Sequence, residues 1–333
     1  MKSTSFNAYW VSEDPEGIFR QQVIRRNTGD LPQNGVLIKV KYSSLNYKDA
    51  LSASGNKGVT RRYPHTPGID ATGVVVESNS ELFLPGDQVL VTGYDLGMNT
   101  PGGFGEYINV PAEWVVPKPE GLNPEECMIL GTAGFTAALA IYHLLRSGQK
   151  PEDGPLLVTG ATGGVGSHSV AIASALGFEV VASTGKTEMH EYLGKLGAAR
   201  SINRTETDDL SGRMLLHAQW AGAIDTVGGN TLATVLKSLK PHGNVATCGN
   251  VASPLLNTTV FPFILNGVNL LGVNSATTPM ALRLSIWQNL ATVWKPNLGC
   301  IKTETIELKN LSTAIEAILK GNITGRVILK QYE

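Results

Sequence analysis

Four consecutive polar residues, Asn46-Tyr47-Lys48-Asp49, follow an apolar run that is typical of a buried strand. A tyrosine hydroxyl can donate a proton, and an amide can hydrogen-bond to an oxygen that gains negative charge. We therefore treat Asn46, Tyr47 and Lys48 as candidate catalytic residues. Asp49 would either orient Lys48 or cap a helix that begins at Ala50. The alternative is that the four residues form only the first turn of a helix, with Tyr47 packed on its neighbours.

A second candidate site is the glycine-rich segment 160–166, G-A-T-G-G-V-G, between a predicted strand at 156–159 and a predicted helix at 165–176. It matches G-x-G-x-x-G except that Ala161 stands at the first glycine position. Glycines let the backbone approach a pyrophosphate closely, and a helix N-terminus offers free N–H groups. Strand, glycines and helix in this order favour a dinucleotide site over an ordinary glycine-rich turn.

The residues after the next predicted strand indicate which dinucleotide binds. NAD sites usually have an acidic residue there, whereas this chain has Ser183-Thr184-Gly185-Lys186, and the first acid is Glu188. Hydroxyls and a lysine suit a 2′-phosphate, and Arg204 could add a planar cation. We therefore predict NADPH. The alternative is that Lys186 and Arg204 are ordinary surface charges.

Two domains would position these residues. The first third is rich in short β-branched runs broken by Gly and Pro, which predicts a small, irregular antiparallel barrel. From about residue 150, apolar strands alternate with helices, which predicts a parallel sheet covered on both faces. We expect an α/β protein with a catalytic domain at 1–124, completed by 296–333, and a nucleotide-binding domain at 125–295.

Composition excludes several classes of protein. A net charge of -1 over 333 residues gives no general attraction to nucleic acid or to anionic lipid. The three cysteines form no C-x-x-C pair, which argues against a zinc cluster or a disulfide framework. No apolar run is expected to be long enough to cross a membrane, which takes about 20 residues. We expect a cytoplasmic protein that binds neither nucleic acid nor membrane.

Five segments in this order give the chain a resemblance to a known family. They are S-S-L-N-Y-K-D at 43–49, P-G-I-D at 67–70, G-T-A-G-F-T-A at 131–137, V-T-G-A-T-G-G-V-G at 158–166 and W-A-G-A-I-D-T-V-G at 220–228. Nearly the whole chain resembles the medium-chain dehydrogenase/reductase superfamily. Within it, the chain is similar to the zinc-independent quinone oxidoreductases, in particular the NADPH-dependent acryloyl-CoA reductase subgroup. The resemblance implies a GroES-like irregular β-barrel plus a Rossmann doubly wound parallel sheet, with the active site in the cleft between them.

The resemblance also implies roles for individual residues. The pyrophosphate would contact Thr162, Gly163, Gly164 and Val165. The ribose phosphate would contact Ser183, Thr184, Gly185 and Lys186, with Arg204 beside them. Tyr47 would lie at the nicotinamide, and the remaining cofactor contacts would be Thr132, Thr136, Asn250, Ile264, Ser275 and Arg326.

Zinc-dependent relatives place a cysteine near 46–48 and Gly-His-Glu where this chain has Gly68-Ile-Asp70, so we expect no metal. A site without zinc suits hydride addition to an electron-poor double bond, as in an enoyl-CoA, an enone or a quinone. Two alternatives to the reduction of a CoA thioester remain open: a quinone reductase and a non-catalytic NADPH-binding protein. Lys57, Arg61 and Arg62 would meet CoA phosphates or belong to a solvated loop. The segment 266–273 would pair with a second subunit in a homodimer, or form an internal strand.

Overall fold

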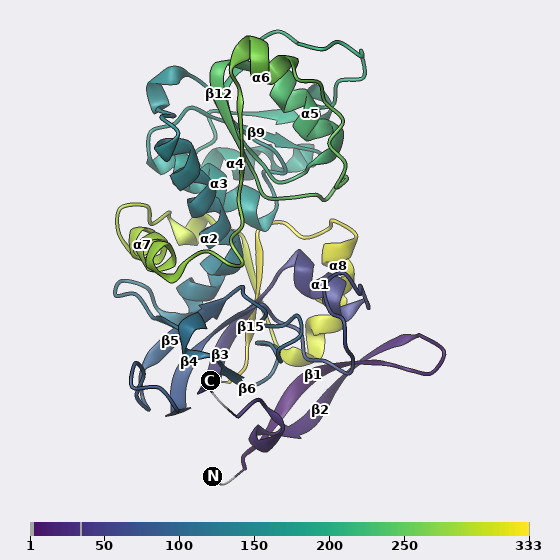
Figure 1. Ribbon diagram of the computed structural model, residues 1–333, viewed down its shortest axis with the longest axis vertical. Coiled ribbons are helices and arrows are strands. Elements are labelled where there is room, and N and C mark those ends of the chain that lie inside the picture. Colours follow the sequence, from purple (N-terminus) through teal and green to yellow (C-terminus); the bar gives the residue numbers. More distant parts are fainter. Residues whose placement is uncertain (1–2, 34, 333) are drawn as a thin grey trace. The chain divides into compact units, whose positions relative to one another are not determined.

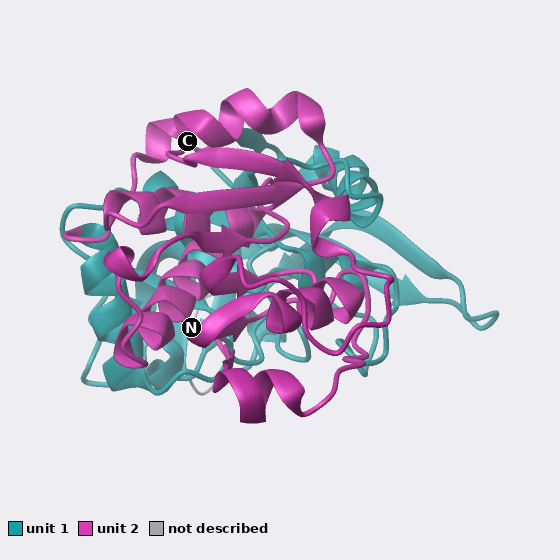
Figure 2. Ribbon diagram, turned by 90° about the horizontal axis from the view of Figure 1, so that it is seen from above, with its two compact units in different colours: residues 1–132, 276–291, 302–333 teal, residues 133–275, 292–301 magenta. Residues whose placement is uncertain are grey.

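The computed structural model describes residues 3–33 and 35–332. They form two compact units (Figure 2). Unit 1 comprises Met1–Thr132, Ala276–Ala291 and Lys302–Glu333, and unit 2 comprises Ala133–Ser275 and Thr292–Ile301. The first boundary between the units therefore falls after residue 132, whereas the sequence suggested residue 124. Residues 276–291, which were expected in the nucleotide-binding domain, belong to unit 1.

Unit 1 contains, in its described residues, a seven-stranded sheet and a separate hairpin of β1 and β2. The sheet order is β14-β15-β3-β4-β5-β7, β6 also pairs with β3, and every pair except β14–β15 is antiparallel. The strands are β1 (Ser5–Glu13), β2 (Phe19–Asn27), β3 (Val36–Leu45), β4 (Asp70–Ser78), β5 (Gln88–Thr92), β6 (Tyr107–Val110), β7 (Val116–Pro117), β14 (Thr303–Ile306) and β15 (Arg326–Lys330). The helices are α1 (Tyr47–Ala53), α7 (Met280–Ala291) and α8 (Leu311–Leu319).

The strand β3 leads directly into the polar turn. Val36, Ile38 and Val40 alternate along it, and all three are buried in one apolar cluster with residues of β4, β5 and β6. At its other end β3 pairs with β15, where Leu45 lies opposite Val327 (Figure 1). This pairing brings Arg326, at the start of β15, next to the turn that begins at Asn46.

Unit 2 is a six-stranded parallel sheet with the order β10-β9-β8-β11-β12-β13, all within described residues. In chain order this is 3-2-1-4-5-6, the arrangement of a doubly wound dinucleotide-binding sheet, with its switch point between β8 and β11. The strands are β8 (Leu156–Val158), β9 (Val180–Thr184), β10 (Arg200–Asn203), β11 (Trp220–Asp225), β12 (Leu239–Thr247) and β13 (Asn269–Gly272). The helices are α3 (Gly164–Ala175), α4 (His190–Lys195), α5 (Gly229–Lys237) and α6 (Phe261–Asn266).

The helix α2 (Pro124–Arg146) corrects one expectation. Its 23 residues are long and apolar enough to cross a membrane, which the sequence reading had missed. However, 72% of its most apolar window is buried inside the protein. Its backbone also breaks at Gly131, where φ is 50° and ψ is -154°. These features are those of a core helix.

Candidate functional site

The polar turn is the N-terminus of α1, which begins at Tyr47 and not at Ala50. Asn46 is the N-cap residue, with extended backbone angles. The Asn46 N–H donates to Asp49 Oδ2 at 2.8 Å, so the carboxylate satisfies one of the free donors at the helix start. The expectation that Asp49 is the N-cap residue of a helix beginning at Ala50 is wrong, and Asp49 instead contributes to the cap from the third position of the helix.

Asp49 does not orient Lys48. Its side chain is buried, and Oδ1 accepts a hydrogen bond from the Ile69 N–H at 2.8 Å. Burial raises the pKa of Asp49 to about 7, the negative charge of Asp70 adds to the increase, and the hydrogen bonds oppose it. Tyr47 is 37% exposed. The side chains of Tyr47 and Lys48 have no hydrogen bond or ion pair with any residue that the structure describes.

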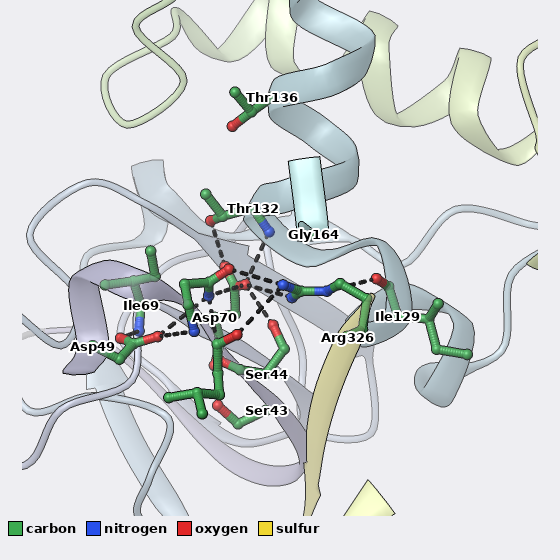
Figure 3. Close-up of polar contacts among 12 residues, drawn as sticks. Ser43, Ser44, Asp49, Ile69, Asp70, Ile129, Thr132, Thr136, Gly164 and Arg326 are labelled. Atoms are coloured by element: carbon green, nitrogen blue, oxygen red, sulfur yellow. Dashed lines mark hydrogen bonds and ion pairs between the residues drawn. The ribbon is translucent and has the colours of Figure 1, made fainter. Parts of the chain in front are cut away.

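Asp70 is the centre of a buried polar cluster beneath the turn (Figure 3). Its Oδ2 accepts hydrogen bonds from Ser44 Oγ at 2.6 Å and from Asn46 Nδ2 at 2.9 Å. Thr132 donates its N–H to Oδ2 at 2.9 Å and its hydroxyl to Oδ1 at 2.5 Å. Thr132, a predicted cofactor contact, is therefore bound within unit 1 to a carboxylate that the sequence reading had not selected.

Arg326 completes this cluster from β15. Its Nε donates to Ile129 O at 3.0 Å, its Nη1 donates to Asn46 Oδ1 at 3.2 Å, and its Nη2 lies 3.9 Å from Asp70 Oδ2. The side chain is only 3% exposed. Burial lowers the pKa of Arg326, and the charges of Asp70 and Asp49 oppose that shift. Nη2 is buried and has no hydrogen bond to a described residue, so the phosphate contact implied by the resemblance stays a prediction.

The side-chain amide of Asn46 is also used within unit 1. Its Nδ2 donates to Asp70 Oδ2, and it also lies 3.3 Å from both Ser44 O and Asp49 Oδ2. An amide has two hydrogens, and both have acceptors here. Asn46 therefore positions the turn, and its donation to a reacting oxygen stays a prediction, because both hydrogens already have acceptors within unit 1. Tyr47 and Lys48 also remain candidates.

Gly131 makes the cluster possible. A Cβ at this residue would lie 2.6 Å from Asp70 Oδ2, 2.7 Å from Ser44 Oγ and 3.0 Å from Arg326 Nη2. Its φ of 50° is in the left-handed region that side chains disfavour. The break in α2 thus lets the Thr132 N–H turn towards Asp70.

In unit 2, the glycine-rich turn connects β8 to α3 as predicted. Gly160 has φ of 59°, and a Cβ on Gly166 would lie 2.2 Å from Gly160 O, so the helix packs directly on the turn. Gly163 is the N-cap of α3 and provides no side-chain hydrogen bond. The first N–H groups of α3, including those of Gly164 and Val165, are therefore suited to an anion.

The ends of β9 and β10 bring the other predicted phosphate contacts together. Thr184 Oγ1 accepts the Lys186 N–H at 3.1 Å and lies 3.2 Å from Thr162 Oγ1. A Cβ on Gly185 would lie 2.9 Å from Arg204 Cδ and Nε, so the exposed Arg204 lies against this glycine. Ser183 was expected beside the ribose phosphate. Its hydroxyl is buried and lies 3.3 Å from Thr207 Oγ1.

Three of the remaining candidates lie at one edge of this sheet. Asn250 follows β12 and Ser275 follows β13, and the carboxyl ends of parallel strands share an edge. Thr136 Oγ1 donates to Ser275 Oγ at 2.8 Å.

Ile264 lies on the helix that precedes β13. It is 66% exposed on α6, whose terminal Gly267 lies against His242 in the amino-terminal half of β12. The cofactor contact that the resemblance implied for Ile264 stays a prediction.

The sequence reading missed a role for Asp225, although it lies in the quoted segment 220–228. Asp225 ends β11 and is buried. Its carboxylate accepts hydrogen bonds from Thr159 Oγ1 at 2.7 Å, Gly228 N–H at 2.9 Å and Thr247 Oγ1 at 3.2 Å. Burial raises the pKa of Asp225, and these hydrogen bonds oppose the increase. Asp225 thus ties three strand ends together at the switch point, where doubly wound sheets bind ligands.

No group of three His, Cys, Asp or Glu side chains within 3–33 and 35–332 is arranged to hold a metal ion.

Two family models match the chain. Residues 32–120 match the alcohol dehydrogenase GroES-like domain, and residues 164–291 match the zinc-binding dehydrogenase model. The acrylyl-CoA reductase AcuI of Ruegeria pomeroyi is 43% identical over 329 residues, covering 97% of this chain and 98% of AcuI.

Two solved structures are similar over almost the whole chain. Escherichia coli YhdH with bound NADPH has a TM-score of 0.94 at 41% identity, covering 98% of this chain and 100% of YhdH. Bacillus subtilis yhfP with NAD bound has a TM-score of 0.95 at 43% identity, covering 98% and 99%. YhfP is provisionally named a quinone oxidoreductase.

The fold and these matches define a medium-chain dehydrogenase/reductase, and the chain belongs to that superfamily of oxidoreductases. Within the superfamily, its relatives at 40% identity or more include AcuI, YhfP and YhdH. The resemblance drawn from the sequence is confirmed, as are the GroES-like and Rossmann parts of the fold.

Proposed function

We propose that this protein is an NADPH-dependent reductase of an activated carbon–carbon double bond, with acryloyl-CoA or a similar enoyl thioester as substrate. The 43% identity to acrylyl-CoA reductase AcuI over nearly the whole of both chains carries this proposal. The NADPH complex of the similar E. coli YhdH supports the choice of cofactor. The NAD complex of yhfP makes that choice worth testing directly.

The residues of unit 2 fit a dinucleotide with a 2′-phosphate. In the turn 160–166, glycine occupies position 166, where a Cβ would collide with the backbone of Gly160. The N-terminus of α3 presents its N–H groups beside this turn. Beyond β9, Arg204 lies against Gly185, Lys186 is the next residue in the chain, and the strand end carries no carboxylate. Thr162, Gly163, Gly164 and Val165 would hold the pyrophosphate, and Thr184, Gly185, Lys186 and Arg204 the 2′-phosphate.

Bound NADPH would supply a hydride to the β-carbon of the double bond. The chain must then stabilise negative charge on the carbonyl oxygen and deliver a proton to the α-carbon. Tyr47 is our proton donor, because its hydroxyl is accessible and is not engaged by any described residue. Lys48 would stabilise the developing charge. Asn46 and Asp70 hold the turn that carries both side chains.

Steady-state kinetics with acryloyl-CoA, a quinone and a simple enone test the proposal. We expect the highest kcat/KM with NADPH and acryloyl-CoA. The variant Tyr47→Phe should lower kcat about 100-fold, the usual minimum contribution of a general acid. Tyr107→Phe, which removes a hydroxyl elsewhere in unit 1, is the matched control and should leave kcat unchanged. Turnover of the quinone alone would replace the thioester proposal.

The quinone reaction is the second candidate, and the provisional name of YhfP favours it. A non-catalytic NADPH-binding protein is the third. Tight NADPH binding with no turnover of any of the three acceptors would identify that class.

We also propose that the enzyme is a homodimer. β13 is the terminal strand of its sheet, and the adjacent segment exposes Val260 at 62%, Ile264 at 66% and Leu265 at 62%. An edge strand beside exposed apolar side chains suits a second copy of the chain. Sedimentation should give a dimer, and Ile264→Asp with Leu265→Asp should give a monomer. An unchanged sedimentation coefficient would contradict this interface.

The three cysteines of the described chain are free thiols, which suits a reducing cytoplasm, our proposed location. Cell fractionation would test it. We further propose that unit 1, expected at 1–124 with 296–333, acts as the catalytic domain, and that unit 2, expected at 125–295, acts as the NADPH-binding domain.

A further inference from the structure

The loop that follows α1 is fixed to the protein at its base. Thr60 is buried, and its Oγ1 lies 2.6 Å from Ser52 Oγ in α1. The hydroxyl of Tyr63 donates to Ser52 O at 2.6 Å, and the Arg61 N–H donates to Asn99 Oδ1 at 3.1 Å. These contacts hold the backbone on both sides of Arg61 and Arg62.

The side chains of Arg61 and Arg62 are nevertheless exposed, and neither has a hydrogen bond or ion pair within the described part of the chain. The nearby carboxylate of Asp95 is already bound by Asn99 Nδ2 at 2.9 Å and Thr100 Oγ1 at 3.1 Å. A fixed backbone thus presents two adjacent guanidinium groups to solvent, and the planar guanidinium matches the geometry of a phosphate group.

Lys57, the third cation of this loop, is different. It forms an ion pair with Glu13 and lies 5.2 Å and 4.8 Å from the ring centroids of Phe19 and Tyr63. Its charge is therefore paired within unit 1, and the two arginines are the available cations of the loop.

The position of the arginines relative to Tyr47 follows from α1. Ser52 is five residues beyond Tyr47, which corresponds to about 8 Å along the helix axis. Thr60 touches Ser52, and Arg61 follows it. A thioester reacting near Tyr47 would therefore extend its pantetheine arm along α1 and place its phosphates near the arginines.

We propose that Arg61 and Arg62 bind the phosphate groups of a CoA thioester and make the enzyme selective for CoA substrates over free enones. This inference rests on the proposed reductase function, and it adds a phosphate site in unit 1. The two arginines then determine substrate affinity and take no part in hydride or proton transfer.

Kinetics with acryloyl-CoA and with acryloyl-pantetheine distinguish the phosphate site from the reductase function, because acryloyl-pantetheine has the same reacting group without the nucleotide. In the double variant Arg61→Gln/Arg62→Gln we expect KM for acryloyl-CoA to rise about tenfold or more, with kcat unchanged. KM for acryloyl-pantetheine should not change. The control is Arg213→Gln, which removes an exposed arginine from unit 2 and should alter neither substrate. Arg61→Lys/Arg62→Lys should retain part of the affinity.

Calorimetric titration of free CoA into the protein gives a readout that does not depend on turnover. Wild type should bind CoA, the double glutamine variant should bind it at least tenfold more weakly, and added salt should reduce the difference. Equal kcat/KM of wild type for both thioesters, or an unchanged KM for acryloyl-CoA in the double variant, would overturn the phosphate site while leaving the reductase function intact. If neither thioester is reduced, the proposed function fails, and the CoA titration alone then decides the phosphate site.

Discussion

Replacing Arg326 by methionine should strongly destabilise unit 1. The substitution keeps most of the side-chain volume but removes the cation 3.9 Å from Asp70. Both side chains are buried, at 3% and 0% exposure, so water cannot replace the guanidinium. Removing one partner of a buried ion pair typically costs about 3–5 kcal/mol, because the other charge remains uncompensated. The variant also leaves Ile129 O and Asn46 Oδ1 without this donor.

Denaturant unfolding at pH 7 would measure this loss. The matched control is Arg20→Met, which breaks an ion pair with Asp14 at 3.1 Å. Arg20 is 70% exposed, so the control should cost about 1 kcal/mol or less. The double variant Asp70→Asn/Arg326→Met should recover part of the stability, because it removes the uncompensated charge. A cost for Arg326→Met similar to that of the control would refute the reasoning.

Three further predictions concern the carboxylates of Asp49 and Asp225 and the predicted contact of Lys186 with the 2′-phosphate of NADPH. The pKa of Asp49 is raised from 3.8 to about 7, so its favourable contribution to stability is present below about pH 4 and is lost as pH rises through 7. Unfolding of wild type should show a fall of up to about 4 kcal/mol over this range, and Asp49→Asn should flatten the profile. The Asp225 carboxylate accepts the backbone N–H groups of Val227 and Gly228, so in Asp225→Asn an amide nitrogen would face one of these donors. Fluorescence titration should show that this variant binds NADPH at least about tenfold more weakly than wild type. Asn244→Ala, which disrupts a buried polar contact where β12 meets the first residue of β13, should lower the melting temperature without changing the dissociation constant for NADPH. Lys186→Ala should weaken NADPH about tenfold and NADH little, and equal losses would contradict a 2′-phosphate contact.

The sequence alone determined the nucleotide-binding half in considerable detail. The turn 160–166, the following helix and the cations at 186 and 204 were all identified from residue type and spacing. These features are local: a strand, a glycine turn and a helix fix their own geometry, and parallel strands then align their carboxyl ends at one edge. The family resemblance followed from the same short segments.

The polar turn at 46–49 was only partly determined by the sequence. The four polar residues were identified, but their roles depend on Asp70 and Arg326, and Arg326 lies 280 positions from Asn46. Only the pairing of β15 with β3 and the break at Gly131 bring these groups together. The amide hydrogens of Asn46 go to acceptors within unit 1, and Arg326, for which the resemblance implied a phosphate contact, is buried. Short-range patterns therefore determined which residues could react, and long-range burial decided which of them have polar atoms left for a ligand.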